Sequence, residues 1–191
     1  MRSDALANRD RVLAAAEEVF AEAGSAGSTE EIARRAGVGI GTVFRHFPTK
    51  QALVEAAVVR HFALLTEEAR RLAGDGDGDG DGDGDGDGDG DGDPGSAFRG
   101  FVRTMVVGTP TKLALITLLG GLTEAARAAS VELGAAVAVL LARAQQAGAI
   151  RPDASIDEVY VLIRALAHAS GEPDVVDRAV GIVLDGLAHR R

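Results

Sequence analysis

The sequence STEEIARRAGVGIGTVFRHFPTK, residues 28–50, decides how the N-terminal part of the chain folds. Ser28 followed three residues later by Glu31 is a capping box, which predicts that a helix begins here. Gly37 predicts the end of that helix, because glycine adopts a left-handed backbone at little cost. A second helix is expected from about Ile40 until the following proline, which cannot continue it. Two short helices joined by a tight, glycine-containing turn indicate a helix-turn-helix.

The second of these helices has an apolar side and a polar side. Val43, Phe44 and Phe47 recur at the spacing that faces a core. The residues left outside are Gly41, Thr42, Arg45 and His46. A long cation, a hydroxyl group and a glycine that permits close approach suit a helix that lies in the major groove of DNA.

The start of the third helix suits a phosphate. Thr49 can cap a helix whose first residue is Lys50. An exposed cation beside the free amides of a helix N-terminus attracts an anion from two directions. The alternative is a pair of surface helices in an ordinary bundle, because the helix-turn-helix spacing is weak evidence by itself.

The run I-A-x-x-A-G-V-x-x-G-T-V-F-x-H-F-P-T-K, from Ile32 to Lys50, resembles the DNA-binding signature of the TetR family of bacterial transcriptional regulators. The resemblance implies an all-α protein with a three-helix helix-turn-helix DNA-binding domain and a helical bundle that binds a ligand and dimerises. It implies a repressor that binds a palindromic, double-stranded DNA operator as a homodimer and is released by a small-molecule effector.

The residues expected at the DNA are Ser28, Gly39, Ile40, Gly41, Thr42, Phe44, Arg45, His46 and Lys50. Three features depart from the family's pattern. Phe44 stands where tyrosine is usual and cannot make the phenolic bond to phosphate, and Gly39 stands where serine is common and lacks a capping hydroxyl. The stretch from Gly24 to Ile32 is one residue shorter than the pattern.

The net charge of −9 would ordinarily argue against a nucleic-acid partner. Ten of the 29 acids, however, lie in the Gly-Asp tract of residues 74–93, and the rest of the chain has a net charge of +1. Residues 34–60 contain five Lys and Arg against the single acid Glu55, a local charge of +4. Because screening limits charge interactions to about 10 Å, this local charge is the one that meets phosphate.

Composition excludes several classes of function. The chain has no cysteine, so it has no disulfide framework and no thiolate metal site. Its four histidines are scattered, and no catalytic constellation or phosphate loop occurs, so we expect no enzyme, cofactor or metal site. No apolar run reaches the length of a membrane span, and the N-terminus is charged, which predicts a cytoplasmic protein without a membrane partner.

The chain is expected to divide into four parts: a DNA-binding domain over 1–50, a connecting helix over 51–73, a linker over 74–95 and a ligand-binding and dimerisation domain over 96–191. A first helix is predicted over Asp10–Ala23, and the first seven residues of the chain are expected to form a loose arm. The ten Gly-Asp repeats have nothing to bury and repel one another, which predicts disorder. Their alternative use is weak cation binding, since the apolar residue of calcium-binding repeats is missing.

The C-terminal half is rich in apolar residues at helical spacing. Helices are predicted over 96–107, 111–129, 130–147, 156–170 and 174–188, and a capping box of Ser155 and Glu158 opens the fourth. The last two have apolar faces too large for a monomer to expose, which predicts a four-helix dimer interface. A ligand pocket is expected among residues 96–147, with an apolar lining and these polar candidates: Arg103, Thr104, Thr117, Thr123 and Glu124.

One rival interpretation belongs to another class. The chain would then be a helical protein-interaction module without sequence-specific DNA binding, and its acidic tract would bind basic partners.

Overall fold

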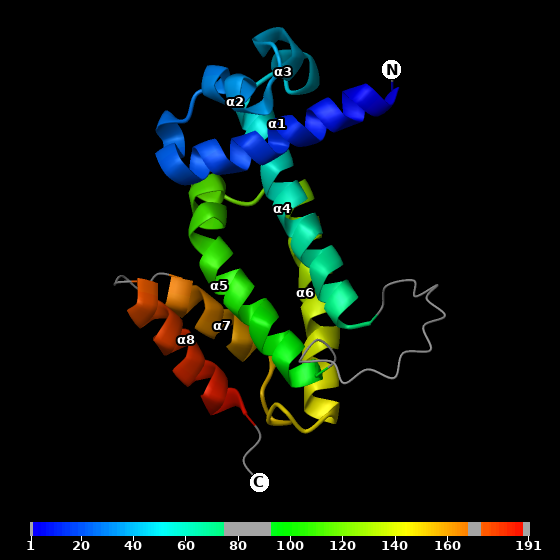
Figure 1. Ribbon diagram of the computed structural model, residues 1–191, viewed down its shortest axis with the longest axis vertical. Helices are drawn as coiled ribbons and strands as arrows, with labels where there is room; N and C mark the ends of the chain where they lie inside the picture. The colour runs from blue at the N-terminus through cyan, green and yellow to red at the C-terminus, as the bar shows by residue number, and fades with distance from the viewer. Residues whose placement is uncertain (1, 75–92, 168–172, 189–191) are drawn as a thin grey trace. The chain divides into compact units, whose positions relative to one another are not determined.

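The computed structural model describes residues 2–74, 93–167 and 173–188; for residues 2–4, 108–114, 167 and 173 it describes the backbone alone (Figure 1). Within these ranges every regular element is a helix, apart from an isolated antiparallel bridge between Ile150 and Ala188. The all-α expectation is confirmed. The residues form two compact units, one of Met1–Leu64 with Pro110–Ser130 and one of Leu65–Thr109 with Val131–Arg191.

The first unit contains the predicted helix-turn-helix. Its elements are α1 (Arg2–Ala23), the short 3-10 helix η1 (Gly24–Ala26), α2 (Thr29–Ala36), α3 (Ile40–His46) and the N-terminal part of α4 (Lys50–Leu72). The helix α1 packs against both α2 and α3, and it crosses the start of α4 (Figure 1). The two short helices are therefore held on a longer one.

The core of this unit is aliphatic with two phenylalanines. Its buried members on α1, α2, α3 and α4 include Val12, Leu13, Ala16, Val19, Phe20, Ile32, Ala33, Ala36, Val43, Phe47, Leu53, Val54 and Ala57. They recur at three- and four-residue intervals, so each helix buries one stripe and exposes the other side.

Local hydrogen bonds begin and end these helices where the sequence predicts. The Ser28 Oγ accepts from the Glu31 amide at 3.1 Å, and the Thr49 Oγ1 accepts from the Ala52 amide at 3.0 Å. Gly37 ends α2 with φ of +66°, a backbone conformation that strains other residues. The second half of the Ser28 capping box does not form, because the Glu31 carboxylate bonds to arginines instead.

An ion-pair network joins α2 to α1. Arg35 donates to Glu22 on α1 at 2.5 and 2.8 Å and to Glu31 on its own helix at 2.9 Å. Arg34 makes two further bonds to Glu31, at 2.6 and 2.8 Å. These hydrogen bonds lower the pKa of Glu31 to about 2 and raise the pKa of Arg35. The network fixes α2 along the end of α1.

The expected loose N-terminal arm is wrong. The helix α1 begins at Arg2, eight residues before the predicted start at Asp10, although Leu6 is 63% exposed and buries little. The segment is rich in Ala, Leu and Arg, which are strong helix formers, and extending an existing helix requires no new nucleus.

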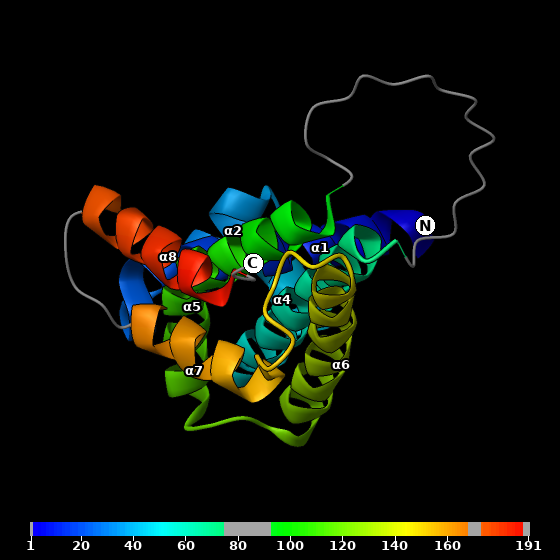
Figure 2. The ribbon, with the colours of Figure 1, turned by 90° about the horizontal axis from the view of Figure 1, so that it is seen from below.

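The second unit holds the remaining helices. They are α5 (Pro94–Leu119), α6 (Glu124–Gln146), α7 (Ile156–Ala167) and α8 (Pro173–Leu187), of which α5 and α6 also contribute residues to the first unit. Their buried residues include Phe98, Phe101, Met105, Leu133, Val137, Leu140, Val159, Ile163, Val180 and Leu184. The helices α7 and α8 pack together and run in opposite directions (Figure 2).

The predicted boundary between the helices of residues 96–107 and 111–129 is wrong. One helix, α5, continues through Pro110 to Leu119, and the chain breaks at Gly120 and Gly121. These two glycines have φ of +72° and +133°, which no α-helix contains, and the Thr123 Oγ1 then caps α6 by accepting from the Ala126 amide. A proline removes one helical hydrogen bond, and here it does not end the helix.

Hydrogen bonds hold both ends of the loop that precedes α7. Ser155 and Glu158 form the complete predicted capping box, with the Ser155 amide donating to Glu158 Oε2 at 2.8 Å and the Glu158 amide donating to Ser155 Oγ at 3.3 Å. The Arg151 amide donates to the Leu187 carbonyl at the end of α8. The end of α8 is therefore tied to the loop that precedes α7.

The described residues that flank the Gly-Asp tract pack on one end of α6. A Cβ built on Gly74 would lie 2.5 Å from an Arg143 nitrogen, and one built on Gly95 would lie 2.4 Å from the Ala149 Cβ. Asp93 caps the first turn of α5 by accepting from the Ser96 amide at 2.9 Å. The predicted disorder of the tract falls on residues 75–92, outside the described residues.

Among the described residues one helix, α6, is long and apolar enough to cross a membrane by length and composition alone. A helix of a soluble protein's core passes the same test, so this single helix says little. Leu133, Val137 and Leu140 on α6 are buried against protein.

Shortening the tract should leave the fold intact, because both flanking segments are held by their own packing. Deleting Gly80–Asp87 should raise the free energy of unfolding by about 0.5 kcal/mol, since a shorter loop costs less closure entropy. Thermal and urea unfolding measure this difference. A variant in which the same positions carry Gly-Ser repeats separates length from charge, and a marked loss of stability on deletion would show that the tract is structural.

Replacing Glu31 with Gln should remove an acid-sensitive part of the stability. The pKa of Glu31 lies below its ordinary 4.5, so its contribution is complete above pH 4.5 and is lost as the pH falls to about 2. The free energy of unfolding of Glu31→Gln should therefore depend less on pH across this window. Urea unfolding at a series of pH values tests this, with the exposed Glu30→Gln as the control; equal pH dependence in both variants contradicts it.

Candidate nucleic-acid interface

The outer face of α3 is exposed and not covered by any described residue. Val43 is fully buried and Phe47 nearly so, which anchors the helix, while Gly41 and Arg45 are exposed and Thr42 is half-buried. A Cβ built on Gly41 would meet no atom within 4 Å, so this face has room for a partner.

Two apolar side chains of α3 also lie outside. Phe44 is 45% exposed and Ile40 is 38% exposed. Periodicity placed Phe44 toward the core, and that expectation is wrong. Val43 and Phe47 already fill the buried side of this seven-residue helix, and Phe44 lies one residue, or 100°, beyond Val43. The position of Phe44 agrees instead with its place among the residues expected at the DNA.

Arg45 differs from the other cations between residues 34 and 60. Arg34 and Arg35 are paired with Glu31 and Glu22, and the Arg60 Nη1 donates to Glu17 at 2.7 Å. Arg45 is exposed and has no hydrogen bond or ion pair within the described residues. Among the arginines of residues 34–60, Arg45 on α3 is therefore the one without an acidic partner in the described part of the chain.

Three further residues expected at the DNA, Gly39, His46 and Ser28, differ in their exposure and in the contacts they make. Gly39 is the N-cap of α3 and supplies no side-chain bond, as its identity predicts. His46 is half-buried, and its ring centroid lies 6.2 Å from that of Phe47. Ser28 is exposed at the start of α2, where its Oγ accepts the Glu31 amide and keeps its own hydroxyl proton to donate.

Lys50 makes contacts that no sequence pattern predicted. Its Nζ donates to the carbonyl oxygens of Ser25 at 2.9 Å and of Gly27 at 2.6 Å, and lies 5.4 Å from the centroid of the Phe20 ring. The residue is exposed overall, but its ammonium group is bonded to the turn between α1 and α2. A lysine bound to a phosphate and a lysine bound to backbone carbonyls carry the same sequence signature.

The five polar residues expected to bind a ligand are not grouped in one unit. Arg103 and Thr104 belong to the second unit, whereas Thr117, Thr123 and Glu124 belong to the first. Arg103 pairs with Asp177 on α8 at 2.9 Å, and the Thr104 Oγ1 donates to the Gly100 carbonyl. Thr123 is engaged as the cap of α6. Thr104 also lines a small cavity of about 290 Å³ between the end of α4 and the start of α5, together with Glu68 and Phe101.

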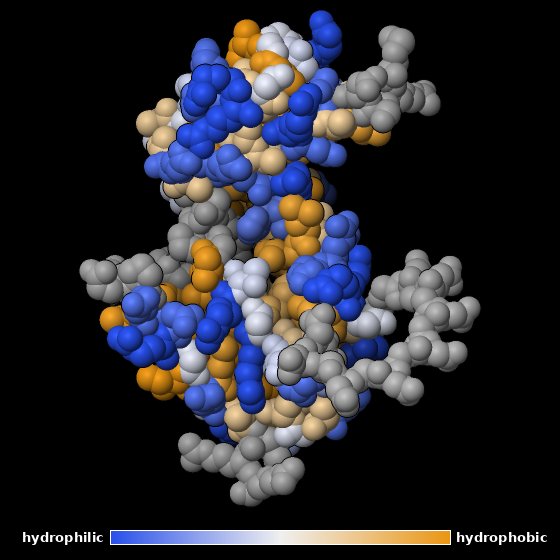
Figure 3. All heavy atoms as spheres, in the orientation of Figure 1, coloured by the Kyte–Doolittle hydropathy of each residue, from blue (hydrophilic) through white to orange (hydrophobic). Residues whose placement is uncertain are grey.

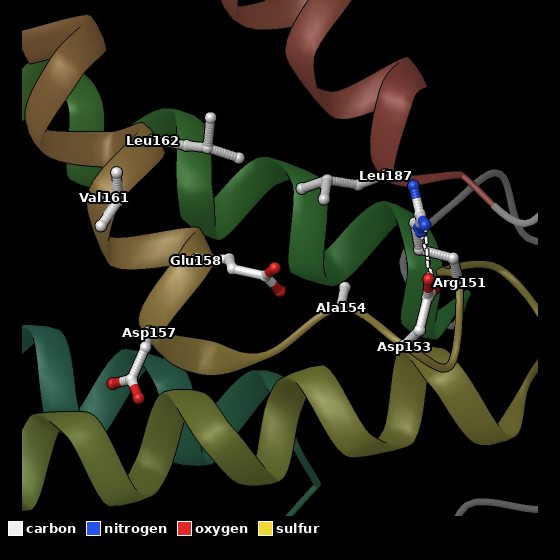
Figure 4. A pocket seen from close by; sticks show the side chains of 8 residues that line it. All are labelled: Arg151, Asp153, Ala154, Asp157, Glu158, Val161, Leu162 and Leu187. Atoms are coloured by element: carbon white, nitrogen blue, oxygen red, sulfur yellow. Dashed lines mark hydrogen bonds and ion pairs between the residues drawn. The ribbon is translucent and has the colours of Figure 1, made fainter.

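A larger open groove of about 480 Å³ lies beside α7 in the second unit (Figure 4). Its apolar wall consists of Ala154, Val161, Leu162 and Leu187. The ion pair of Arg151 and Asp153 lies at one end, and Asp157 and Val161 lie at the other (Figure 4).

Charge limits what this groove can hold. The hydrogen bond from Arg151 lowers the pKa of Asp153 to about 2, and hydrogen bonds from Ser155 lower the pKa of Glu158, so both carboxylates are ionised at neutral pH. Asp157 adds a third acid to the lining. An apolar groove with an acidic rim disfavours an anionic ligand. No group of three His, Cys, Asp or Glu in the described part of the chain is arranged to hold a metal ion.

Sequence reasoning missed the contacts between distant residues. The pairs of Arg35 with Glu22 and of Arg60 with Glu17 join residues on different helices, and so does the bond from Lys50 to the turn. Acids at helical spacing on α1 were visible in the sequence, but their partners depend on how the helices cross.

Two sequence models of protein families match the chain. Residues 12–57 match the bacterial regulatory proteins of the tetR family, and residues 93–189 match the C-terminal domain of SbtR-like transcriptional regulators. No curated protein matches the sequence significantly.

Solved structures agree with these matches. A TetR transcription regulatory protein from Mycobacterium vanbaalenii is 36% identical, with 98% of each chain covered and a TM-score of 0.76. A TetR transcriptional regulator from Streptomyces coelicolor is 30% identical, with 96% of this chain and 99% of that chain covered and a TM-score of 0.77. A regulator from Thermus thermophilus has the same fold at 16% identity, with 96% of each chain covered and a TM-score of 0.60.

These matches span the helix-turn-helix and the helical C-terminal part alike. The chain belongs to the TetR family of bacterial transcriptional regulators.

Proposed function

We propose that the protein is a ligand-responsive repressor that binds a palindromic operator as a homodimer, with α3 as the reading helix. The observation that carries this proposal is the outer face of α3, where a hydroxyl group and an open glycine lie together with an arginine that has no partner among the described residues. DNA is the partner that uses all three: guanidinium groups pair with guanine edges, and glycine lets the backbone come near the duplex.

Each residue of the proposed surface has a place in this scheme. Arg45 and Thr42 contact base edges, and Phe44 and Ile40 make apolar contacts to thymine methyl groups or sugars. Ser28, Gly39, Gly41 and His46 lie at the backbone of the duplex. Phe44 has no hydroxyl to donate to a phosphate, so this protein relies on the other members of the set for that contact.

The proposed dimer interface is the surface of α7 and α8. Val161 on α7 and Val175 and Ile182 on α8 are exposed by 57%, 50% and 73%, and hydrophobic side chains lie among polar ones over α8 (Figure 3). Val175 and Ile182 are seven residues apart and so lie on one side of α8. Pairing of two copies would cover them and supply two reading helices, which a palindrome with half-sites about 34 Å apart requires.

The proposed effector is a small, mainly apolar molecule without negative charge. The acidic rim of the groove beside α7 and the paucity of aromatic residues support this class of ligand. None of the polar candidates from the sequence lines this groove, and Thr104 lines the smaller cavity of the second unit instead; the five candidates are Arg103, Thr104, Thr117, Thr123 and Glu124. Such a molecule releases DNA only if it binds the DNA-releasing state of the dimer more tightly than the DNA-binding state. For a usual coupling, the two binding free energies differ by about 1–3 kcal/mol. The protein would act in the cytoplasm, without catalytic activity.

Replacing Arg45 with Ala should change which bases are preferred and weaken binding by about 1–3 kcal/mol, the usual worth of a bidentate contact to a base. Selection of duplexes from a randomised pool, followed by titration of the selected duplex, measures both effects. The control is Arg70→Ala, which removes an exposed cation from the other end of α4. If the parent protein and the Arg45 variant select the same bases with the same affinity, α3 is not the reading helix.

Replacing Ile182 with Asp should give a monomer, because it introduces a charge into the proposed apolar interface. Analytical ultracentrifugation compares its mass with that of the parent. Val131→Asp on α6 is the matched control, since Val131 is 69% exposed, close to the 73% of Ile182, but lies on another helix. A dimer that survives Ile182→Asp contradicts the proposed interface.

A further inference from the structure

We infer that Lys50 is a positioning residue, whose ammonium group clasps the turn between α1 and α2 and so sets how the start of α2 meets DNA. This inference rests on the proposed DNA binding and changes the role of one residue within it. The sequence favours a direct phosphate contact for Lys50. In the structure the ammonium group of Lys50 donates to backbone carbonyl oxygens instead.

The ammonium group of Lys50 forms two hydrogen bonds within the protein. It donates to the carbonyl oxygens of Ser25 and Gly27, and the shorter of these bonds, 2.6 Å, is partly buried. Two of the three N–H donors of Lys50 are therefore used within the protein. Hydrogen bonds from a charged donor are stronger than those between neutral groups. The faces of aromatic rings attract cations, and the Phe20 ring lies 5.4 Å from the Nζ.

The place of Lys50 in its helix explains why it needs these acceptors. It is the first residue of α4, where the helix dipole disfavours a cation. The carbonyl oxygens of the turn supply the compensating partial negative charge. Without them the ammonium group would be drawn away from this helix end into solvent.

The turn that Lys50 contacts is packed closely against α1. Gly27 is buried, and a Cβ built on it would lie 2.9 Å from both the Phe20 Cδ1 and the Val19 Cγ1. The amide of Gly27 donates to the Gly24 carbonyl at 3.2 Å, and the carbonyl of Gly27 accepts from the Lys50 Nζ at 2.6 Å. Gly27 thus contacts α1 on one side and α4 on the other.

The carbonyl of Gly27, which accepts from Lys50, lies one residue before Ser28, the N-cap of α2. Ser28 follows Gly27 directly, accepts the Glu31 amide with its Oγ and accepts the Ile32 amide with its carbonyl. A shift of the Gly27 carbonyl therefore moves Ser28 and the free amides at the start of α2, which are the groups that a DNA phosphate would meet. Lys50 acts on DNA binding through this helix end.

Amide hydrogen exchange without DNA tests the clasp directly. Lys50→Met keeps the unbranched apolar side chain and removes the donors. The amides of Gly27, Glu31 and Ile32 should then exchange about tenfold faster, because a hydrogen bond to a charged group is lost. The amides of α3 should be unaffected. Arg70→Met is the matched control for loss of an exposed cation from α4. Unchanged protection at the three amides in Lys50→Met overturns the inference.

Titration with DNA distinguishes positioning from a phosphate contact. The probe is the duplex that the parent selects from a randomised pool, titrated at several salt concentrations. Lys50→Met should weaken binding with an unchanged slope of log K against log salt, whereas a lost phosphate contact makes this negative slope shallower by about 0.9. A slope that is shallower by that amount, with unchanged amide exchange, assigns Lys50 to the phosphate and overturns the inference.

Gly27→Ala provides an independent variant with every charge intact. Its Cβ should displace the turn, weaken binding with an unchanged slope and be non-additive with Lys50→Met, since both act on the same turn. Additive effects contradict a shared mechanism. If the parent selects no duplex at all, the proposed function fails, and the exchange measurements still decide whether the clasp exists.

Discussion

The burial of Phe20 on α1 is the constraint on which the DNA-binding unit depends. Its side chain is fully buried, the turn after α1 approaches it so closely that only glycine fits at position 27, and the Lys50 ammonium lies over its ring. One aromatic side chain thus fixes the end of α1, the start of α2 and the start of α4. Replacing it by a smaller residue would leave a cavity where three elements meet.

Ion pairs, more than the overall composition, decide where this protein carries unpaired charge. The chain is acidic overall, and the positive stretch between residues 34 and 60 is largely neutralised by Glu17, Glu22 and Glu31. These pairs are exposed or partly exposed, so each adds little stability. Their effect is to orient α2 and α4 against α1 and to leave Arg45 on α3 as an arginine without an acidic partner among the described residues.

The C-terminal half shows how competing local signals are resolved. The segment around Gly108 and Pro110 and the pair Gly120 and Gly121 both suggest a break, and the chain breaks at the second. Pro110 lacks one donor, which a long helix tolerates when the rest of its length is packed. The glycine pair adopts positive φ, which ends a helix outright, and Thr123 is in place to start the next one.

The sequence by itself determined the helical class, the caps at Ser28, Thr49 and Ser155, the end of α2 at Gly37 and the polar face of α3. These features depend on hydrogen bonds and spacings within three or four residues, which the order of residues specifies. Only the tertiary structure decided that Arg35 pairs with Glu22, 13 residues away, that Arg60 pairs with Glu17, 43 residues away, and that Lys50 bonds to Gly27, 23 residues away. Such partners are chosen by how helices cross when their apolar stripes are buried, and no local pattern encodes that crossing.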